Sequence, residues 1–256
     1  MNLSALELSL LLPALLAGFL VLASHVPLGA QVLARGIVFI DLAIAQIAGL
    51  GVIAADRLGF EPQGMGVQLA AVSAAMLGSL LLTYTDKRWP EVQEALIGVL
   101  FVMAATGGIL LLSNNPHGGE HLKDLLVGQI LWVNYQQLPL AAAVSLGVAA
   151  LWFIWGARLG RLGFYVLFSL AVTASVQLVG IYLVFASLIV PAMATRHYAG
   201  RPRLWFAYLH GFAAYALGLL LAAWWDLPAG AVIVWVMAVL GLAVYAVGPR
   251  GKLRAA

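Results

Sequence analysis

The chain has 256 residues, of which 64% are hydrophobic and only 9% are charged. No soluble domain needs that much apolar surface, so the composition predicts an all-α, polytopic membrane helix bundle in one transmembrane domain over residues 1–256. The net charge is +3, but the basic residues stand in ones and twos at loop positions, which argues against nucleic acid as a partner. The lack of cysteine excludes disulfides and thiolate metal sites.

The chain begins with MNLSALELS, which has an acidic residue and no Lys or Arg before the first apolar run. A cleavable signal peptide starts with positive charge, so we expect the first run to be a retained helix. A helix needs roughly 20 residues to cross about 30 Å of hydrocarbon. The runs long enough to span, or nearly so, are 8–24, 36–55, 67–85, 92–113, 138–157, 163–195, 204–223 and 230–247.

The run at 163–195 is too long for one crossing, because 33 residues of helix would measure about 50 Å. Gly180 lies in its middle and is the expected break. The sequence therefore predicts eight to nine transmembrane segments.

The basic residues test this count. With the N-terminus outside and the C-terminus cytoplasmic, eleven of the thirteen Lys and Arg residues fall on the cytoplasmic side, as the positive-inside rule requires. Only Arg57 and Lys123 fall outside. The cytoplasmic set is Arg35, Lys87, Arg88, Arg158, Arg161, Arg196, Arg201, Arg203, Arg250, Lys252 and Arg254.

Two acidic residues lie inside apolar runs, Asp41 and Glu94. A carboxylate inside a membrane helix costs roughly 2.5–3.5 kcal/mol, so Asp41 either lines a polar path or caps a helix near one membrane face. Gln46 follows five residues later, about 500° of helical rotation, so the two side chains lie some 140° apart on a regular helix. Glu94 lies three residues after Glu91 at an expected helix N-terminus, where the helix dipole favours carboxylates.

The longest polar connection runs from Ser113 to about Gln137 and falls outside in this topology. We expect Leu125–Val133 to be an interfacial or re-entrant helix. His117, Glu120 and His121 precede it in the string HGGEH. On a helix the two imidazoles would share one side and form an external metal funnel, whereas the Gly-Gly pair favours a solvated loop.

Motifs for chemistry are missing: the sequence has no P-loop, nucleophile elbow or dinucleotide fingerprint. We therefore expect a transport protein that does not hydrolyse ATP itself. An intramembrane enzyme has no catalytic pair to support it.

The segment SVQLVGIYLVFASLIVPAMATR closely resembles the late helix of the metal-type ABC transporter permeases, the zinc, manganese and iron uptake family. GIVFIDLAIAQIAGLG resembles the second helix of that family, and EALIGVLFVMAATGGILLLS and HLKDLLVGQILWV resemble two later segments, in the same order. The late-helix positions are Val179, Gly180, Leu183, Val184, Ala186, Pro191 and Ala192.

The resemblance implies the permease subunit of an ABC importer for a divalent transition metal, with zinc as the first choice and manganese or iron as others. It implies a homodimer in the inner (plasma) membrane with the path along its two-fold axis, a separate cytoplasmic ATPase and an extracytoplasmic substrate-binding protein. The metal is the substrate, and no cofactor is expected. The alternative is a secondary transporter driven by an ion gradient. The implied residues are Asp41, Gln46 and Glu94 for the pathway, Arg158, Gly160 and Arg161 for ATPase docking, and Gly180 and Pro191 for the structural motif.

Two positions depart from the family pattern. The family usually has a metal-ligating His four residues after the acid of the second helix, where this chain has Ala45. The family also has a longer cytoplasmic segment for ATPase docking, of which only Gly156–Gly163 remains here.

Overall fold

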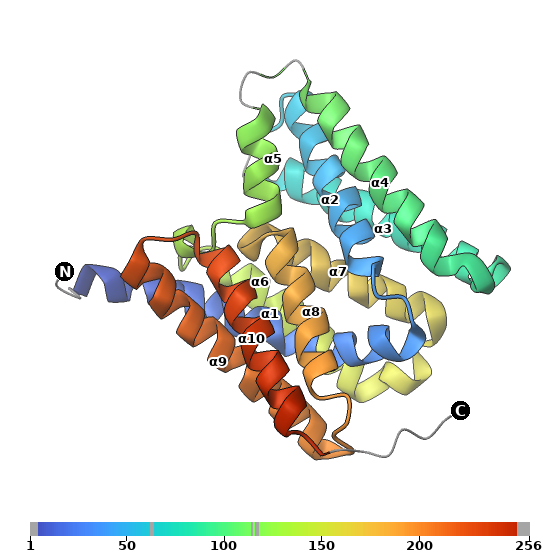
Figure 1. Ribbon diagram of the computed structural model, residues 1–256. Coiled ribbons are helices and arrows are strands. Elements are labelled where there is room, and N and C mark those ends of the chain that lie inside the picture. The colour runs from blue at the N-terminus through green and yellow to red at the C-terminus, as the bar shows by residue number, and fades with distance from the viewer. Residues whose placement is uncertain (1–4, 62–63, 114, 116–117, 250–256) are drawn as a thin grey trace.

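The computed structural model describes residues 5–61, 64–113, 115 and 118–249. Within these ranges every regular element is a helix, so the predicted all-α fold is confirmed (Figure 1). Short 3-10 turns lie at Pro90–Val92, Ile130–Trp132 and Gly156–Arg158. The α-helices are α1 (Ala5–Arg35), α2 (Ile40–Arg57), α3 (Met65–Arg88), α4 (Gln93–Leu112), α5 (Gly118–Val127), α6 (Leu138–Trp155), α7 (Gly160–Val179), α8 (Ile181–Ala194), α9 (Arg201–Trp225) and α10 (Ala229–Val247).

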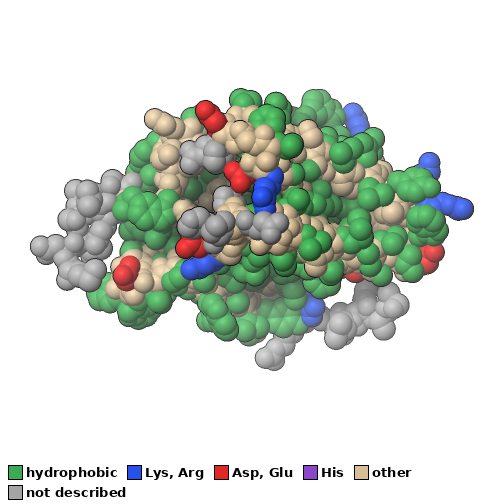
Figure 2. All heavy atoms as spheres, turned by 90° about the horizontal axis from the view of Figure 1, so that it is seen from above, with side chains coloured by type: hydrophobic (Ala, Val, Ile, Leu, Met, Phe, Trp, Pro, Cys, Tyr) green, Lys and Arg blue, Asp and Glu red, His purple; other side chains and the backbone are tan. Residues whose placement is uncertain are grey.

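Seven helices in the described part of the chain are long and apolar enough to cross a membrane. They are α1, α3, α4, α6, α7, α9 and α10. The 14-residue α8 is shorter, and the 18-residue α2 carries charged residues at both ends. Counting these two gives the nine segments expected, and the exact number of crossings stays a prediction. The protein is a multi-pass membrane protein, and Figure 2 shows the largely apolar surface this requires.

The helices form two groups with α7 between them (Figure 1). In one group α2 packs against both α3 and α4. In the other group α1 packs against α6, α8 and α9, and α10 packs against α8 and α9. α7 contacts α3 and α2 on one side and α6 on the other, and its buried face includes Phe164, Tyr165 and Phe168.

The predicted break at Gly180 is confirmed. α7 ends at Val179 and α8 begins at Ile181, and the glycine between them has φ 82° and ψ 164°, a conformation essentially restricted to glycine. A Cβ on Gly180 would lie 2.3 Å from the backbone nitrogen of Gly128, and a Cβ on Gly128 would lie 2.2 Å from the Val179 carbonyl oxygen. We call this backbone contact the Gly128–Gly180 junction.

The connection between α4 and α6 differs from the prediction of a helix over Leu125–Val133. α5 starts earlier, at Gly118, and ends at Val127, where Gly128 takes φ 71°. The Gly-Gly pair does not prevent the helix because it lies in the first turn, where N–H groups have no intrahelical partner in any sequence. The end of α5 packs closely on the bundle, since a Cβ on Gly230 of α10 would lie 2.6 Å from the Val127 carbonyl oxygen.

The basic residues mark one end of the bundle. The Arg35 guanidinium at the end of α1 lies 4.2 Å from the centre of the Phe164 ring at the start of α7. At the end of α8, Arg196 donates to the Tyr245 hydroxyl near the end of α10 at 2.8 Å. We call this side of the molecule, where α1, α3, α6, α8 and α10 end, the basic end. Arg57 lies at the opposite end and donates from Nε to the Leu111 carbonyl at 2.8 Å, which caps α4.

Candidate functional site

Asp41 is the centre of the candidate site. It lies in the first turn of α2, at the basic end of the bundle, and its side chain is 1% exposed. Neither carboxylate oxygen has a hydrogen-bond partner among the described residues. A buried carboxylate without partners is costly, so such a group is a candidate for binding a cation or a proton.

Glu94 comes from another helix to the same place. Its Oε1 accepts the N–H of Phe39, the N-cap residue of α2, at 3.2 Å. Phe39 has no side chain that can cap the helix, so Glu94 supplies the cap from α4. Glu94 therefore lies at the start of the helix whose first turn carries Asp41. We call Asp41 and Glu94 the acidic pair.

Gln46 does not join the acidic pair from the same face of α2. The helix is regular from Ile40 to Arg57, so the predicted separation of about 140° from Asp41 holds. The Gln46 side chain is 8% exposed and therefore buried within the bundle. Ala45, where the family usually has His, is also buried. This turn of α2 therefore has no histidine that could join the acidic pair as a metal ligand.

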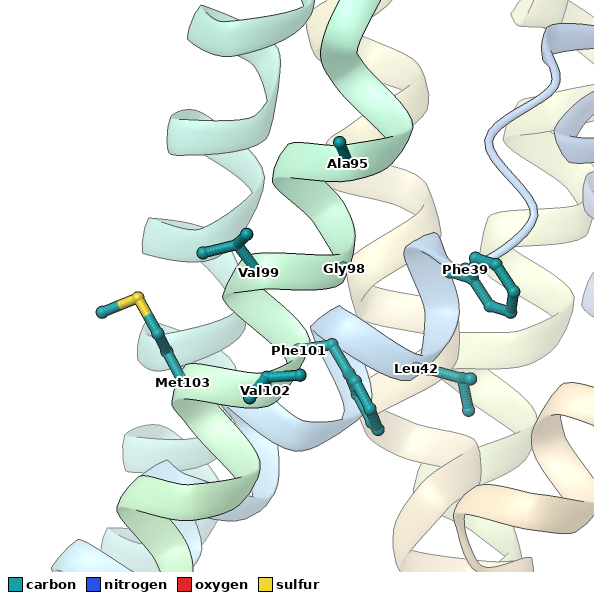
Figure 3. Close-up of a pocket in the computed structure, with 8 residues that line it drawn as sticks. All are labelled: Phe39, Leu42, Ala95, Gly98, Val99, Phe101, Val102 and Met103. Atoms are coloured by element: carbon teal, nitrogen blue, oxygen red, sulfur yellow. The ribbon is translucent and has the colours of Figure 1, made fainter.

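An apolar groove lies beside the acidic pair, between the start of α2 and α4. It has a volume of about 610 Å³. Figure 3 shows side chains without ionisable groups around it, so the groove itself offers a metal no ligand. The lining residues are Phe39, Leu42, Ala95, Gly98, Val99, Phe101, Val102 and Met103.

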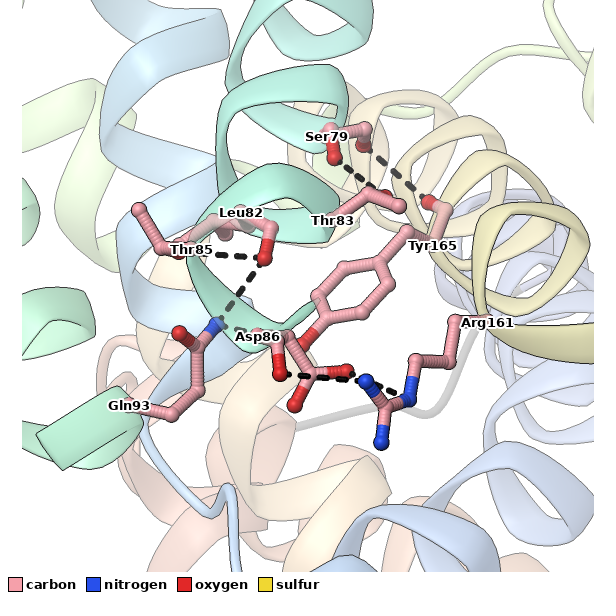
Figure 4. Close-up of polar contacts among 8 residues, drawn as sticks. All are labelled: Ser79, Leu82, Thr83, Thr85, Asp86, Gln93, Arg161 and Tyr165. Atoms are coloured by element: carbon pink, nitrogen blue, oxygen red, sulfur yellow. Dashed lines mark hydrogen bonds and ion pairs between the residues drawn. The ribbon is translucent and has the colours of Figure 1, made fainter. Parts of the chain in front are cut away.

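The residues expected to dock an ATPase lie at the basic end. Arg161 pairs with Asp86 of α3, with Nε 3.4 Å from Oδ2, and its Nη1 donates to the Asp86 carbonyl at 3.1 Å (Figure 4). Arg161 therefore ties α7 to the end of α3. Arg158 is exposed, and Gly160 has φ 59° in the turn that starts α7. Both arginines are exposed, and Arg161 is already paired with Asp86.

The external metal funnel is only partly visible. Glu120 lies in α5 and is exposed, and His121 lies in the same helix. His117 lies outside the described residues. Within the described residues, groups of three or more His, Cys, Asp or Glu side chains arranged to hold a metal are absent. The funnel stays a prediction.

Pro191 lies inside α8 and is buried, and its carbonyl accepts the Thr195 hydroxyl at 2.8 Å. Gly180 and Pro191 thus stand at the two ends of the short broken segment.

Sequence reasoning missed Gln93 and Tyr165. The Gln93 amide donates to the Tyr165 hydroxyl at 3.2 Å and to the Leu82 carbonyl at 3.1 Å, which joins α4, α7 and α3 beside the acidic pair (Figure 4). The only local signal was a polar residue directly before Glu94 at the start of an apolar run.

The fold and the site define a multi-pass helical membrane protein with a buried Asp41 and a half-buried Glu94 near one end of the bundle. The chain belongs to the ABC 3 transport family, whose sequence profile matches residues 7–159 and 155–248. It is a membrane permease subunit and not itself an ATPase, and permeases of ABC transporters work with ATPase and binding-protein partners.

The known proteins similar to this chain are named as membrane proteins of metal transport or uptake systems. A probable metal transport system membrane protein of Chlamydia trachomatis is 25% identical over 89% of this chain and 85% of its own length. The high-affinity zinc uptake system membrane protein ZnuB of Haemophilus influenzae is 23% identical, covering 88% and 92%. The manganese transport system membrane protein MntC of Halalkalibacterium halodurans is 25% identical, covering 87% and 82%.

A solved structure supports the fold. PsaBC from Streptococcus pneumoniae in complex with Fab has a chain that superposes with a TM-score of 0.75 at 22% identity, over 95% of this chain and 92% of that one. This likeness concerns the overall arrangement of the helices.

Proposed function

We propose that this chain is the membrane-spanning permease of an ABC importer that carries a divalent transition metal ion, with zinc as the first candidate and manganese or iron as the others. Family membership and the names of the relatives support the class of substrate. The observation that carries the proposal is the acidic pair, because a dication crossing an apolar bundle needs oxygen ligands where it sheds water. The gradient-driven alternative loses its support, since the chain belongs to an ABC family.

The expected assembly follows from the class. Two copies form a homodimer with the path along its two-fold axis, two ATPase subunits bind at the basic end, and a substrate-binding protein delivers the ion at the opposite end. This orientation makes the basic end cytoplasmic and the N-terminus external, which agrees with the positive-inside rule. Arg158 contacts the ATPase, and Arg161 holds the start of α7 for that contact.

Asp41 is the pathway group in this proposal. Replacing it with Asn keeps the size of the side chain and removes the charge, so Asp41→Asn is expected to abolish metal uptake. The assay is the initial rate of radioactive zinc or manganese uptake by cells that express the whole transporter. Asp56→Asn is the matched control, because it makes the same chemical change at the other end of the same helix, and it is expected to keep wild-type uptake.

The partner proposal has its own test. The tagged protein is purified in mild detergent from its native membrane, and the accompanying subunits are identified by mass spectrometry. An ATPase in stoichiometric amount supports the assembly.

The Asp41→Asn test has one refuting outcome. Normal metal uptake by Asp41→Asn, at wild-type amounts in the membrane, would remove Asp41 from the pathway.

A further inference from the structure

Gln93 makes a buried polar contact with two other helices. It is the first residue of α4, and its side chain is 3% exposed. Its amide nitrogen donates two hydrogen bonds, to the Leu82 carbonyl of α3 and to the hydroxyl of the fully buried Tyr165 of α7. Figure 4 shows the amide directed toward both partners. One side chain therefore fixes the start of α4 against two other helices.

The Gln93 contact is linked to the acidic pair through the backbone of α4. Glu94 follows Gln93 in the chain and caps α2 through the Phe39 N–H. Asp41 lies two residues after Phe39, in the first turn of the capped helix. The position of the Glu94 carboxylate relative to Asp41 thus depends on where α4 starts, and the Gln93 amide sets that start.

We propose that Gln93 and Tyr165 are positioning residues that hold Glu94 at the start of α2, beside Asp41, so that the acidic pair can bind a divalent metal. The inference rests on the proposed function. Neither side chain need touch the ion: Tyr165 holds Gln93, and Gln93 holds the backbone that carries Glu94. Partners one step removed from metal ligands orient those ligands, and their loss typically weakens metal binding about 10-fold to 100-fold.

A neighbouring contact provides the matched control. Ser79 of α3 donates to the Tyr165 carbonyl at 3.1 Å and hydrogen-bonds to the Ser169 hydroxyl of α7. This contact joins α3 to α7, as Gln93 does, but it does not involve α4. Ser79→Ala therefore removes a buried hydrogen bond of the same interface without loosening the acidic pair.

The test measures metal binding directly. The permease is purified together with its ATPase, without the binding protein, and zinc and manganese are each titrated by equilibrium dialysis. Gln93→Met keeps the length of the side chain and removes the amide, and Tyr165→Phe removes only the hydroxyl. Each single variant is expected to raise the Kd by about 10-fold. The double variant is expected to have the same Kd as the single variant that binds metal more weakly, because both changes break the Gln93–Tyr165 hydrogen bond.

The controls separate a positioning role from general destabilisation. Ser79→Ala is expected to keep the wild-type Kd. A Gln93→Met variant and a Tyr165→Phe variant that both keep the wild-type Kd would overturn the inference, as would independent, multiplying losses in the double variant. Should Gln93→Met not reach the membrane, Tyr165→Phe decides alone.

Asp41→Asn distinguishes this inference from the function it rests on. If Asp41→Asn leaves metal binding unchanged, the proposed site is wrong. If Asp41→Asn abolishes binding while Gln93→Met and Tyr165→Phe bind as the wild type does, the site stands and the positioning inference alone fails.

Discussion

The Gly128–Gly180 junction gives the strongest prediction about stability. Replacing Gly180 with Ala adds a Cβ that would lie 2.3 Å from the Gly128 nitrogen and 2.6 Å from its Cα. Both are backbone atoms, so no side chain can rotate away. The residue would also hold φ 82° and ψ 164°, which costs about 1–3 kcal/mol in a residue other than glycine.

The two costs combine. Overpacking of a filled site typically adds about 1–3 kcal/mol, so Gly180→Ala is expected to lower the free energy of unfolding by roughly 2–6 kcal/mol. In chains of this size about 1 kcal/mol shifts the Tm by roughly 2–4 °C, so the Tm should fall by about 5–20 °C. Thermal unfolding of the detergent-purified protein, followed by fluorescence-detected size exclusion, measures it.

The control for this substitution lies in α6. A Cβ on Gly147 would meet no described heavy atom within 4 Å, so Gly147→Ala should leave the Tm unchanged or raise it slightly. A Gly180→Ala protein with the wild-type Tm would show that the junction is looser than the backbone contacts indicate, and the account of the broken helix would have to be abandoned.

Two further predictions concern helix contacts. Glu94→Ala removes the acceptor of the Phe39 N–H and should cost about 1 kcal/mol, whereas Glu94→Gln keeps an acceptor oxygen and should cost less; equal losses in thermal unfolding would contradict the capping role. Gly29→Ala would place a Cβ 1.9 Å from the Leu188 carbonyl oxygen, so α1 and α8 should separate and the protein lose about 1–3 kcal/mol or more. A wild-type Tm for this variant would mean that the two helices approach less closely.

Some of the fold follows from the sequence because a bilayer has a fixed thickness. The run at 163–195 had to break, and Gly180 was the residue able to break it. The helix of α5 was misplaced, because the Gly-Gly pair was taken as a turn. The spacing of Leu122, Leu125 and Leu126, on one side of a helix, was the signal for α5.

The candidate site was predicted only in part. Asp41 stood out because an acid in an apolar run is rare. Its proximity to Glu94 could not be predicted, since the two residues lie on different helices and only the packing of α2 on α4 brings them together. The roles of Gln93 and Tyr165 were hidden for the same reason: a glutamine before a membrane helix reads as a surface residue until its partners are known.

The shortness of α8 has a consequence for the membrane itself. Its 14 residues extend about 21 Å, which is less than the roughly 30 Å of hydrocarbon. A helix of this length that starts at one membrane surface ends inside the hydrocarbon, so the irregular backbone of the Gly128–Gly180 junction is expected at a depth where a peptide group facing lipid would have no partner. α5 packs against α7 and α8, and Gly128 at its end contacts Gly180 directly. A short segment with charged residues thus covers backbone that would otherwise face lipid.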